Sequence, residues 1–353
     1  MTPLHQFIAD AGGTVPFETF MRWALYDPQH GYYSRRVTNV GRTGDFATSA
    51  TLSPALANAI AAWAKTYRAE ITSGKRWHLI EVGPGGGQLA AGILGALRGW
   101  QGRHLTYHLV EISASLAQRQ HEMLRESARG LLAPTLRWHS EIRSALREAS
   151  GSALIISNEL VDAFPCVVLE LGPGVDGFRE VGLRWDDARE QPAEVLLEPS
   201  ADFSACVAAL APEAKRVELH PAWRGWLETW RKDWERGRML TIDYGDHAAT
   251  LYHRRPRGTL RGFFRQQRIE GPEIYERAGQ QDLTADVNFS DLIRWGDGLG
   301  LSAGPLQTLR DFILRWHPGV ETTDAATSQI LDPLGAGRAF KVLEQSADQQ
   351  QLT

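Results

Sequence analysis

The feature that most constrains this chain is an apolar run that leads directly into a cluster of glycines. The run Leu79–Val82 precedes glycines at positions 83, 85, 86 and 87, and a helix-forming stretch begins at Gln88. Glycine lets a backbone turn tightly and lets a ligand approach more closely than a Cβ atom would allow. The pattern predicts a strand, loop and helix of a parallel α/β sheet, with a nucleoside bound over the loop.

The spacing of the glycines indicates which nucleoside is bound. A dinucleotide loop reads GxGxxG, whereas Gln88 occupies the last of those positions and Gly83, Gly85 and Gly87 follow a GxGxG spacing. Glu111 lies 28 residues after Gly83 and ends the next apolar run, where a carboxylate can accept hydrogen bonds from both ribose hydroxyls. We therefore predict S-adenosylmethionine (SAM) as the cofactor, with Glu81 as a second polar anchor near its methionine part.

From residue 77 onward, short apolar runs alternate with helical stretches. This alternation predicts an α/β fold with a mostly parallel, doubly wound sheet, Rossmann-like and of the class I methyltransferase type. We expect a helical section with a cofactor lid at 1–75, the core at 76–163 and 238–345, and an inserted substrate-side region of β-hairpin and helix at 164–237. Tryptophans at 223, 226, 230 and 234 of the inserted region have helical spacing, which fits either a core-facing stripe or a cap over the substrate.

Polar residues follow the apolar run 153–157, at the strand end that faces the transferred methyl group in this fold class. Asn158, Glu159 and Asp162 are the candidate catalytic residues. Carboxylates bind a planar guanidinium by forked contacts, and Glu159 and Asp162 would share one side if the segment is a helical turn. The sequence thus predicts transfer to nitrogen, plausibly of a protein arginine. The alternative is that Asn158 and Asp162 only cap a following helix.

Further polar loops are candidates for the same site. In the segment 41–49, Gly44 and Asp45 could close over the cofactor, with Asp45 meeting its amino group and Thr48 or Ser49 its carboxylate. A plain surface turn is the alternative. The segments 243–246 and 281–289 are candidates for lining the substrate pocket, or for bracing loops.

Composition excludes several classes of protein. Lysine and arginine number 38 against 42 acidic residues, so the net charge gives no reason to expect nucleic acid. The basic cluster at 253–268 is interpreted as a solvated face, with contact to an acidic protein or RNA as the alternative. Cys166 and Cys206 lack the spacing of a zinc site, and a sulfonium needs no metal to activate its methyl group. No run reaches the roughly 18 apolar residues of a membrane span, and the first residues lack a signal or transit leader, so we expect a cytoplasmic protein.

Taken in order, these motifs resemble the MidA-like methyltransferase family, which includes the mitochondrial complex I assembly-factor methyltransferases. The resemblance spans nearly the whole chain and is carried by 21–33, 41–49, the glycine loop, 157–165, 241–245, 258–262 and 281–289. It implies SAM-dependent methylation of a protein arginine, with a respiratory-chain subunit as substrate of the mitochondrial branch.

The chain departs from the family pattern at two places. It reads Ser49–Ser53 where the family has a Ser-Pro-Glu-like continuation, and Arg265–Gln267 where the family carries a histidine. These departures leave the predicted cofactor site intact but put the substrate in doubt. Two other functions stay open: an RNA or small-molecule methyltransferase, and a SAM-binding assembly factor without turnover.

Overall fold

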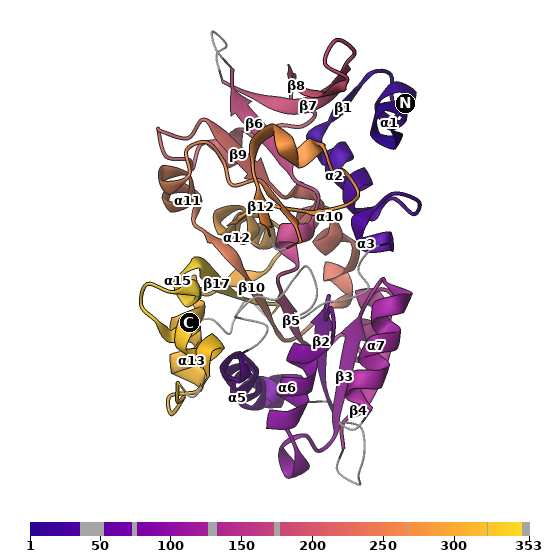
Figure 1. Ribbon diagram of the computed structural model, residues 1–353. Helices are drawn as coiled ribbons and strands as arrows, with labels where there is room; N and C mark the ends of the chain where they lie inside the picture. The colour runs from indigo at the N-terminus through magenta and orange to yellow at the C-terminus, as the bar shows by residue number, and fades with distance from the viewer. Residues whose placement is uncertain are drawn as a thin grey trace. The chain divides into compact units, whose positions relative to one another are not determined.

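A computed structural model of the chain describes residues 1–35, 53–72, 76–125, 133–172, 177–265, 267–322 and 324–347 (Figure 1). The chain divides into two compact units. The first unit comprises Met1–Val37, Val161–Gly225 and Gly245–Leu292. The second unit comprises Thr38–Leu160, Trp226–Tyr244 and Ile293–Thr353. Each unit is therefore built from three separate stretches of sequence.

The second unit contains a mostly parallel sheet with the strand order β15-β17-β10-β5-β2-β3-β4. Neighbours among β10, β5, β2, β3 and β4 are parallel, whereas β17 is antiparallel to β10. These strands are β2 (Trp77–Val82), β3 (Leu105–Val110), β4 (Thr135–His139), β5 (Leu154–Asn158), β10 (Arg238–Asp246), β15 (Ser302–Ala303) and β17 (Phe340–Ser346). The predicted α/β class with a mostly parallel central sheet is confirmed.

The strand order places a topological switch beside the glycine loop. The chain starts in the middle of the sheet at β2, adds β3 and β4 on one side, and then returns to β5 on the other side. In open parallel sheets, ligands bind beyond the carboxyl ends of the strands at such a reversal. The ends of β2 and β5 are therefore where a cofactor site is expected.

Helix α5 (Pro54–Ile71) packs closely against α6 (Gln88–Ala96) because small residues line their contact. Five alanines of α5 belong to the hydrophobic core of this unit, and a Cβ atom added to Gly92 of α6 would lie 2.7 Å from the Cβ atom of Ala57. Ser53 caps α5 by accepting a hydrogen bond from the amide of Ala55 at 3.2 Å. The helix that begins at the glycine loop is therefore closely packed against α5.

The other helices of the second unit lie in the connections between its strands. They are α7 (Ala114–Leu124), α8 (Ile142–Glu148), α13 (Leu309–Trp316), α14 (Ala325–Leu331), α15 (Ala336–Ala339), with the 3-10 turns η1 (Gly99–Gln101) and η3 (Arg231–Asp233). Strand β16 (Gln307–Thr308) pairs with β17. Helices α10 (Pro221–Trp230) and α12 (Phe289–Gly298) run across the boundaries between the two units in the sequence.

The first unit is built around an antiparallel sheet with the order β1-β7-β6-β9, and β8 pairs with β7. A smaller sheet has the order β12-β11-β13. The strands are β1 (Thr14–Pro16), β6 (Val167–Leu171), β7 (Phe178–Asp186), β8 (Gln191–Leu197), β9 (Arg216–Leu219), β11 (Arg261–Phe264), β12 (Gln267–Ile269), β13 (Asp282–Thr284) and β14 (Val287–Asn288). The helices are α1 (Pro3–Asp10), α2 (Phe17–Tyr26), α3 (Tyr32–Arg35), α9 (Ser204–Val207), α11 (Ala248–Arg254), η2 (Val161–Ala163) and η4 (Gly271–Tyr275).

Two tryptophans of the stripe, Trp230 and Trp234, lie in the interior of the second unit, whereas Trp226 is partly exposed. Trp230 and Trp234 are completely buried, and their rings lie 6.1 Å apart. The indole nitrogen of Trp234 donates a hydrogen bond to the carbonyl of Ala153 at 3.0 Å. This burial supports the core-facing interpretation of the stripe.

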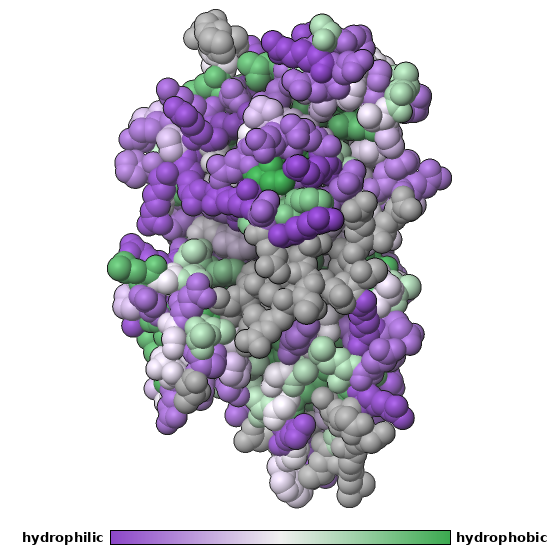
Figure 2. Space-filling view, in the orientation of Figure 1, coloured by the Kyte–Doolittle hydropathy of each residue, from purple (hydrophilic) through white to green (hydrophobic). Residues whose placement is uncertain are grey.

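The visible surface is mainly polar. The face drawn in Figure 2 is dominated by hydrophilic residues, with hydrophobic residues in small separate patches. Among the residues that the structure describes, no helix combines the length and the apolar character that crossing a bilayer requires.

Candidate functional site

The glycine loop has the backbone conformation that the sequence predicts. Gly83, Gly85 and Gly87 have φ angles of 67°, 54° and 83°, in the left-handed region that side chains disfavour. The Gly83 amide donates a hydrogen bond to the carbonyl of Val110 at 3.0 Å, so the loop starts from the β2–β3 pairing. A Cβ atom at Gly83 would lie 2.9 Å from Cδ1 of Leu160. The loop therefore needs glycine for its conformation and, at Gly83, for space.

A buried glutamine connects the loop to the acid at the end of β3. The side-chain amide of Gln120 donates to the carbonyl of Gly85 at 2.7 Å and to Oε2 of Glu111 at 3.2 Å. Its own oxygen accepts a hydrogen bond from the indole of Trp138 at 3.1 Å. Gln120 is completely buried. The glycine loop and Glu111 are thus held by one side chain, which our sequence analysis did not single out.

A signal for Gln120 was present in the sequence. Gln120 stands between Leu116 and Leu124 at four-residue spacing, on the buried face of α7. A polar residue on an apolar helical stripe must find hydrogen-bond partners in the interior, so it marks a specific polar contact. The pattern does not reveal which groups those partners are.

Glu111 retains the capacity to bind hydroxyl groups. Its Oε1 accepts a hydrogen bond from the Ser113 amide at 2.8 Å, and its Oε2 accepts the one from Gln120. A carboxylate has roughly four acceptor positions, so these hydrogen bonds, together with one from the backbone of Ile112, do not use all of them. Burial raises the pKa of Glu111, and the hydrogen bonds from Ser113 and Gln120 act in the opposite direction. These residues fit the ribose of a SAM-type cofactor.

Glu81 lies deeper in the sheet than Glu111. Its Oε2 accepts a hydrogen bond from the hydroxyl of Tyr107 at 2.7 Å, and the residue is 3% exposed. Burial, together with the negative charge of Glu111, raises the pKa of Glu81 to about 7, against the lowering effect of the Tyr107 hydrogen bond. Glu81 therefore exchanges its proton near neutral pH.

At the end of β5, one residue has an unusual backbone conformation and another has a hydrogen-bond acceptor without a partner among the described residues. Glu159 is a non-glycine residue with a φ of 53°, and its amide donates to the carbonyl of Ile242 at 2.9 Å. Nδ2 of Asn158 donates to Oε1 of Glu159 at 3.0 Å. Oδ1 of Asn158 is buried and has no hydrogen-bond partner among the described residues. Such strain and unsatisfied polarity concentrate where proteins bind substrates.

Two details of the predicted catalytic edge need correction. Glu159 does not share a helical turn with Asp162, because its backbone is left-handed and only the three-residue turn η2 follows. The helix-capping alternative also fails for Asn158, since its side-chain amide nitrogen bonds to Glu159 and no α-helix begins there. Asn158 and Glu159 belong to the second unit, whereas Asp162 belongs to the first.

Asp162 is part of a buried acidic cluster in the first unit. Its Oδ2 accepts a hydrogen bond from the hydroxyl of Thr284 at 3.0 Å, while Asp282 accepts one from the hydroxyl of Tyr33 at 2.9 Å. Burial and the charge of Asp162 raise the pKa of Asp282 to about 7. The segment 281–289 thus contributes buried polar groups rather than an ordinary linker.

Gly44, Asp45, Thr48 and Ser49 lie outside the described residues. Asp243 is completely buried and accepts a hydrogen bond from the Tyr244 amide at 3.0 Å, which is a bracing contact at the end of the second unit's β10 segment.

The family follows from comparison with known proteins. Residues 55–305 of this 353-residue chain match the family described as "Putative S-adenosyl-L-methionine-dependent methyltransferase". The chain belongs to this family. The predicted enzyme class and the predicted cofactor, SAM, are confirmed at the level of the family.

Individual relatives agree with this assignment. The chain is 28% identical to the protein arginine methyltransferase NDUFAF7 homolog of Drosophila melanogaster, over 78% of this chain and 65% of that protein. It is 26% identical to protein arginine methyltransferase NDUFAF7 of Rattus norvegicus, over 84% of this chain and 69% of that protein. A crystal structure of a Burkholderia thailandensis protein bound to S-adenosyl-homocysteine is 29% identical, with a TM-score of 0.81, covering 97% of this chain and 90% of that one.

The comparison overturns the predicted location. The curated relatives are named as mitochondrial proteins, which contradicts the cytoplasmic location that we expected. The prediction was wrong because a location is specified by short targeting segments, which leave no trace in the packing or composition of a folded core.

Proposed function

We propose that this protein is a SAM-dependent N-methyltransferase that acts on a protein arginine. The names of the curated relatives, protein arginine methyltransferases, support this substrate class. The observation that carries the proposal is the buried, unpartnered Oδ1 of Asn158 beside the carboxylate of Glu159. Both residues end β5, the strand that pairs with β2 of the glycine loop.

On this proposal, the second unit binds the cofactor through the residues that the sequence predicted. When bound, SAM supplies a methyl group that is already activated by its sulfonium charge. The glycines at 83, 85 and 87 leave the backbone open to the cofactor. The carboxylate of Glu111 accepts hydrogen bonds from the ribose hydroxyls. We retain Glu81 as a polar anchor, and Gly44, Asp45, Thr48 and Ser49 as lid residues.

The acceptor nitrogen is held at the end of β5. A guanidinium N–H donates to Oδ1 of Asn158, which satisfies a buried acceptor, while the carboxylate of Glu159 pairs with the guanidinium charge. The nitrogen that gains a methyl group must lose a proton. Glu159 is the nearby carboxylate that can accept it.

We retain residues 164–237 as the inserted substrate-side region, of which 164–225 lie in the first unit. In the first unit, Asp162 and Asp282 offer buried carboxylates whose negative charge a cationic side chain would balance. The substrate is then a protein rather than a nucleic acid. A respiratory-chain subunit is the first substrate to examine.

Mass spectrometry of arginine methylation in the host tests this function. The gene is deleted and then restored as the wild type, as Glu159→Gln, or as Glu141→Gln, which changes an exposed glutamate of the second unit. We expect one or more arginine marks to disappear on deletion and to return with the wild type and Glu141→Gln only.

Two results would contradict the proposal. If no arginine mark depends on the gene, while methyl label from SAM follows RNA or a small molecule, the substrate class is wrong. If Glu159→Gln restores the growth or assembly defect of the deletion strain without restoring any arginine methylation, the protein acts as a SAM-binding assembly factor.

A further inference from the structure

Three histidines form a continuous row across one face of the second unit's sheet. Nδ1 of His78 and Nε2 of His108 lie 2.9 Å apart, and so do Nδ1 of His108 and Nε2 of His139. They come from β2, β3 and β4. His108 is opposite Ile80, and His139 is opposite Val110, so the row advances by two residues at each strand and stays on one face.

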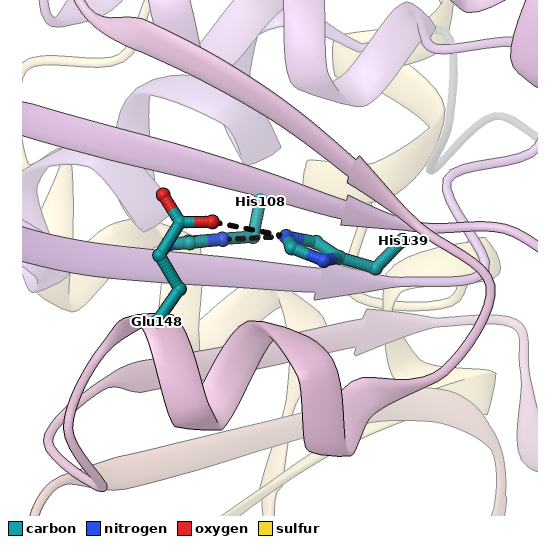
Figure 3. A group of neighbouring side chains, drawn as sticks. All are labelled: His108, His139 and Glu148. Carbon is teal, nitrogen blue, oxygen red and sulfur yellow. Dashed lines mark hydrogen bonds and ion pairs between the residues drawn. The ribbon is translucent and has the colours of Figure 1, made fainter.

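A carboxylate from helix α8 stands at the end of this row. Oε2 of Glu148 lies 3.8 Å from Nε2 of His139. Figure 3 shows His108, His139 and Glu148 directed toward one another, and one ligand atom from each lies within 4.8 Å of the other two. The other oxygen of Glu148 accepts a hydrogen bond from Nε of Arg137 at 3.1 Å, which orients the carboxylate.

The row allows the tautomers that a metal site requires. A neutral imidazole has one N–H group and one lone pair. If Nε2 of His108 donates its proton to Nδ1 of His78, then Nδ1 of His108 keeps its lone pair and faces His139. Metal-binding histidines are commonly fixed by such a contact through the second ring nitrogen.

The distances are close to those of a tetrahedral site. Zinc binds imidazole nitrogen at about 2.0–2.1 Å, so two ligand atoms of a tetrahedral ion are roughly 3.3 Å apart. The ring nitrogens of His108 and His139 at 2.9 Å and the carboxylate oxygen of Glu148 at 3.8 Å from His139 each differ from this spacing by less than about 1 Å, and the His108 and Glu148 ligand atoms lie within 4.8 Å of each other. The side chain of Glu148 is 39% exposed, so solvent has access and can supply a fourth ligand.

We propose that His108, His139 and Glu148 bind a first-row divalent cation, with Zn²⁺ as the preferred ion, and that His78 orients His108. Two imidazoles and a carboxylate are ligands of the type that zinc accepts. The ion links the last turn of α8 to β3 and β4. This site is separate from the methyl transfer, which needs no metal.

Titration of the untagged full chain with ZnCl₂, after removal of metals with a chelator, tests the site. We expect one Zn²⁺ per chain, and tetrahedral visible absorption when Co²⁺ replaces it. His139→Gln and Glu148→Gln should each weaken binding by more than about tenfold, and His78→Gln by roughly 10–100-fold. His317→Gln alters a histidine of the same unit outside the row and should bind as the wild type does.

Folding and metal binding can be separated in these variants. Glu148 is partly exposed, so Glu148→Gln should leave both the thermal unfolding of the metal-free chain and its affinity for S-adenosyl-homocysteine unchanged. The proposal is overturned if the wild type binds no Zn²⁺ saturably, or if His139→Gln and Glu148→Gln bind it as tightly as the wild type. In either case the histidines only form hydrogen bonds with one another and do not bind a metal ion. None of these results depends on which substrate is methylated.

Discussion

The two units of this protein are stabilised in different ways. The second unit is a parallel sheet with an apolar core, and the strands β2 and β3 are buried along their whole length. The first unit is assembled from three chain segments around an antiparallel sheet and buries several charged or polar groups. Both units bury polar side chains with specific partners, such as Gln120 and Arg238 in the second unit. The contrast is between a parallel sheet around a large apolar core and an antiparallel sheet whose separate chain segments are joined by buried carboxylates.

Glu218 is the clearest of these polar contacts in the first unit. Its completely buried carboxylate accepts hydrogen bonds from the amide and hydroxyl of Thr259, at 3.0 and 2.9 Å, and from the Leu260 amide at 3.3 Å. Arg261 then forms an ion pair with Asp286 at 2.6 Å. One carboxylate thus joins β9 to a segment about forty residues further along the chain.

The largest effect that tests this contrast is expected for Glu218→Ala. The change leaves buried amide and hydroxyl donors without an acceptor, and each such group costs roughly 1–3 kcal/mol. We expect a loss of about 4 kcal/mol in the free energy of unfolding, measured by urea denaturation.

A matched control is Glu198→Ala in the same unit, where the glutamate side chain is 82% exposed. We expect a change within about 0.5 kcal/mol there. Equal effects of the two substitutions would mean that the buried contacts of Glu218 do not stabilise the first unit.

Glu81→Gln tests a carboxylate that lies deep in the apolar sheet of the second unit. The pKa of Glu81 is raised from 4.5 to about 7, so its protonated form is favoured in the folded state. Its contribution to stability is present below pH 4.5 and is lost as the pH rises through 7. This loss amounts to about 3 kcal/mol.

The glutamine variant does not ionise, so its free energy of unfolding should fall less than that of the wild type between pH 4.5 and 7.5. Denaturation curves across this range measure the difference. Parallel curves for the two proteins would show that Glu81 does not carry the raised pKa.

Gln120→Ala tests whether the cofactor loop of the second unit also depends on a specific polar contact. The change removes the hydrogen bonds that join Gly85, Glu111 and Trp138. We expect a loss of about 2 kcal/mol in stability and roughly tenfold weaker binding of S-adenosyl-homocysteine, measured by calorimetry. The exposed Gln118→Ala on the same helix should change neither; if both variants bind equally well, Gln120 does not position the loop.

The smallest effects are expected for two glycines of α6, one at its start and one near its end. Gly87 has a φ of 83°, and an added Cβ atom would lie 3.4 Å from Gln120, so Gly87→Ala should destabilise by about 1–2 kcal/mol. Gly95 has open space around it and no such φ angle, so Gly95→Ala should stabilise by about 0.5–1 kcal/mol. Thermal unfolding of both variants measures this difference, and a shift in the same direction for both would contradict it.

The cofactor end of the molecule could be predicted because its signals are local. The strand, the glycine loop and Glu111 are defined by neighbouring residues, and the fold class follows from alternating strands and helices. The catalytic edge was predicted less well. Asn158 and Glu159 stand at the strand end as expected, but the left-handed backbone of Glu159 replaced the predicted helical turn.

The sequence by itself determined the parallel sheet and the cofactor class, since periodicity and glycine spacing are properties of short segments. Only the tertiary structure decided which distant groups meet: Gln120 with Gly85, Glu218 with Thr259, and the histidines of three strands with Glu148. The physical reason is that a buried polar group must find a partner somewhere in the fold. Its own neighbours in the sequence do not specify that partner.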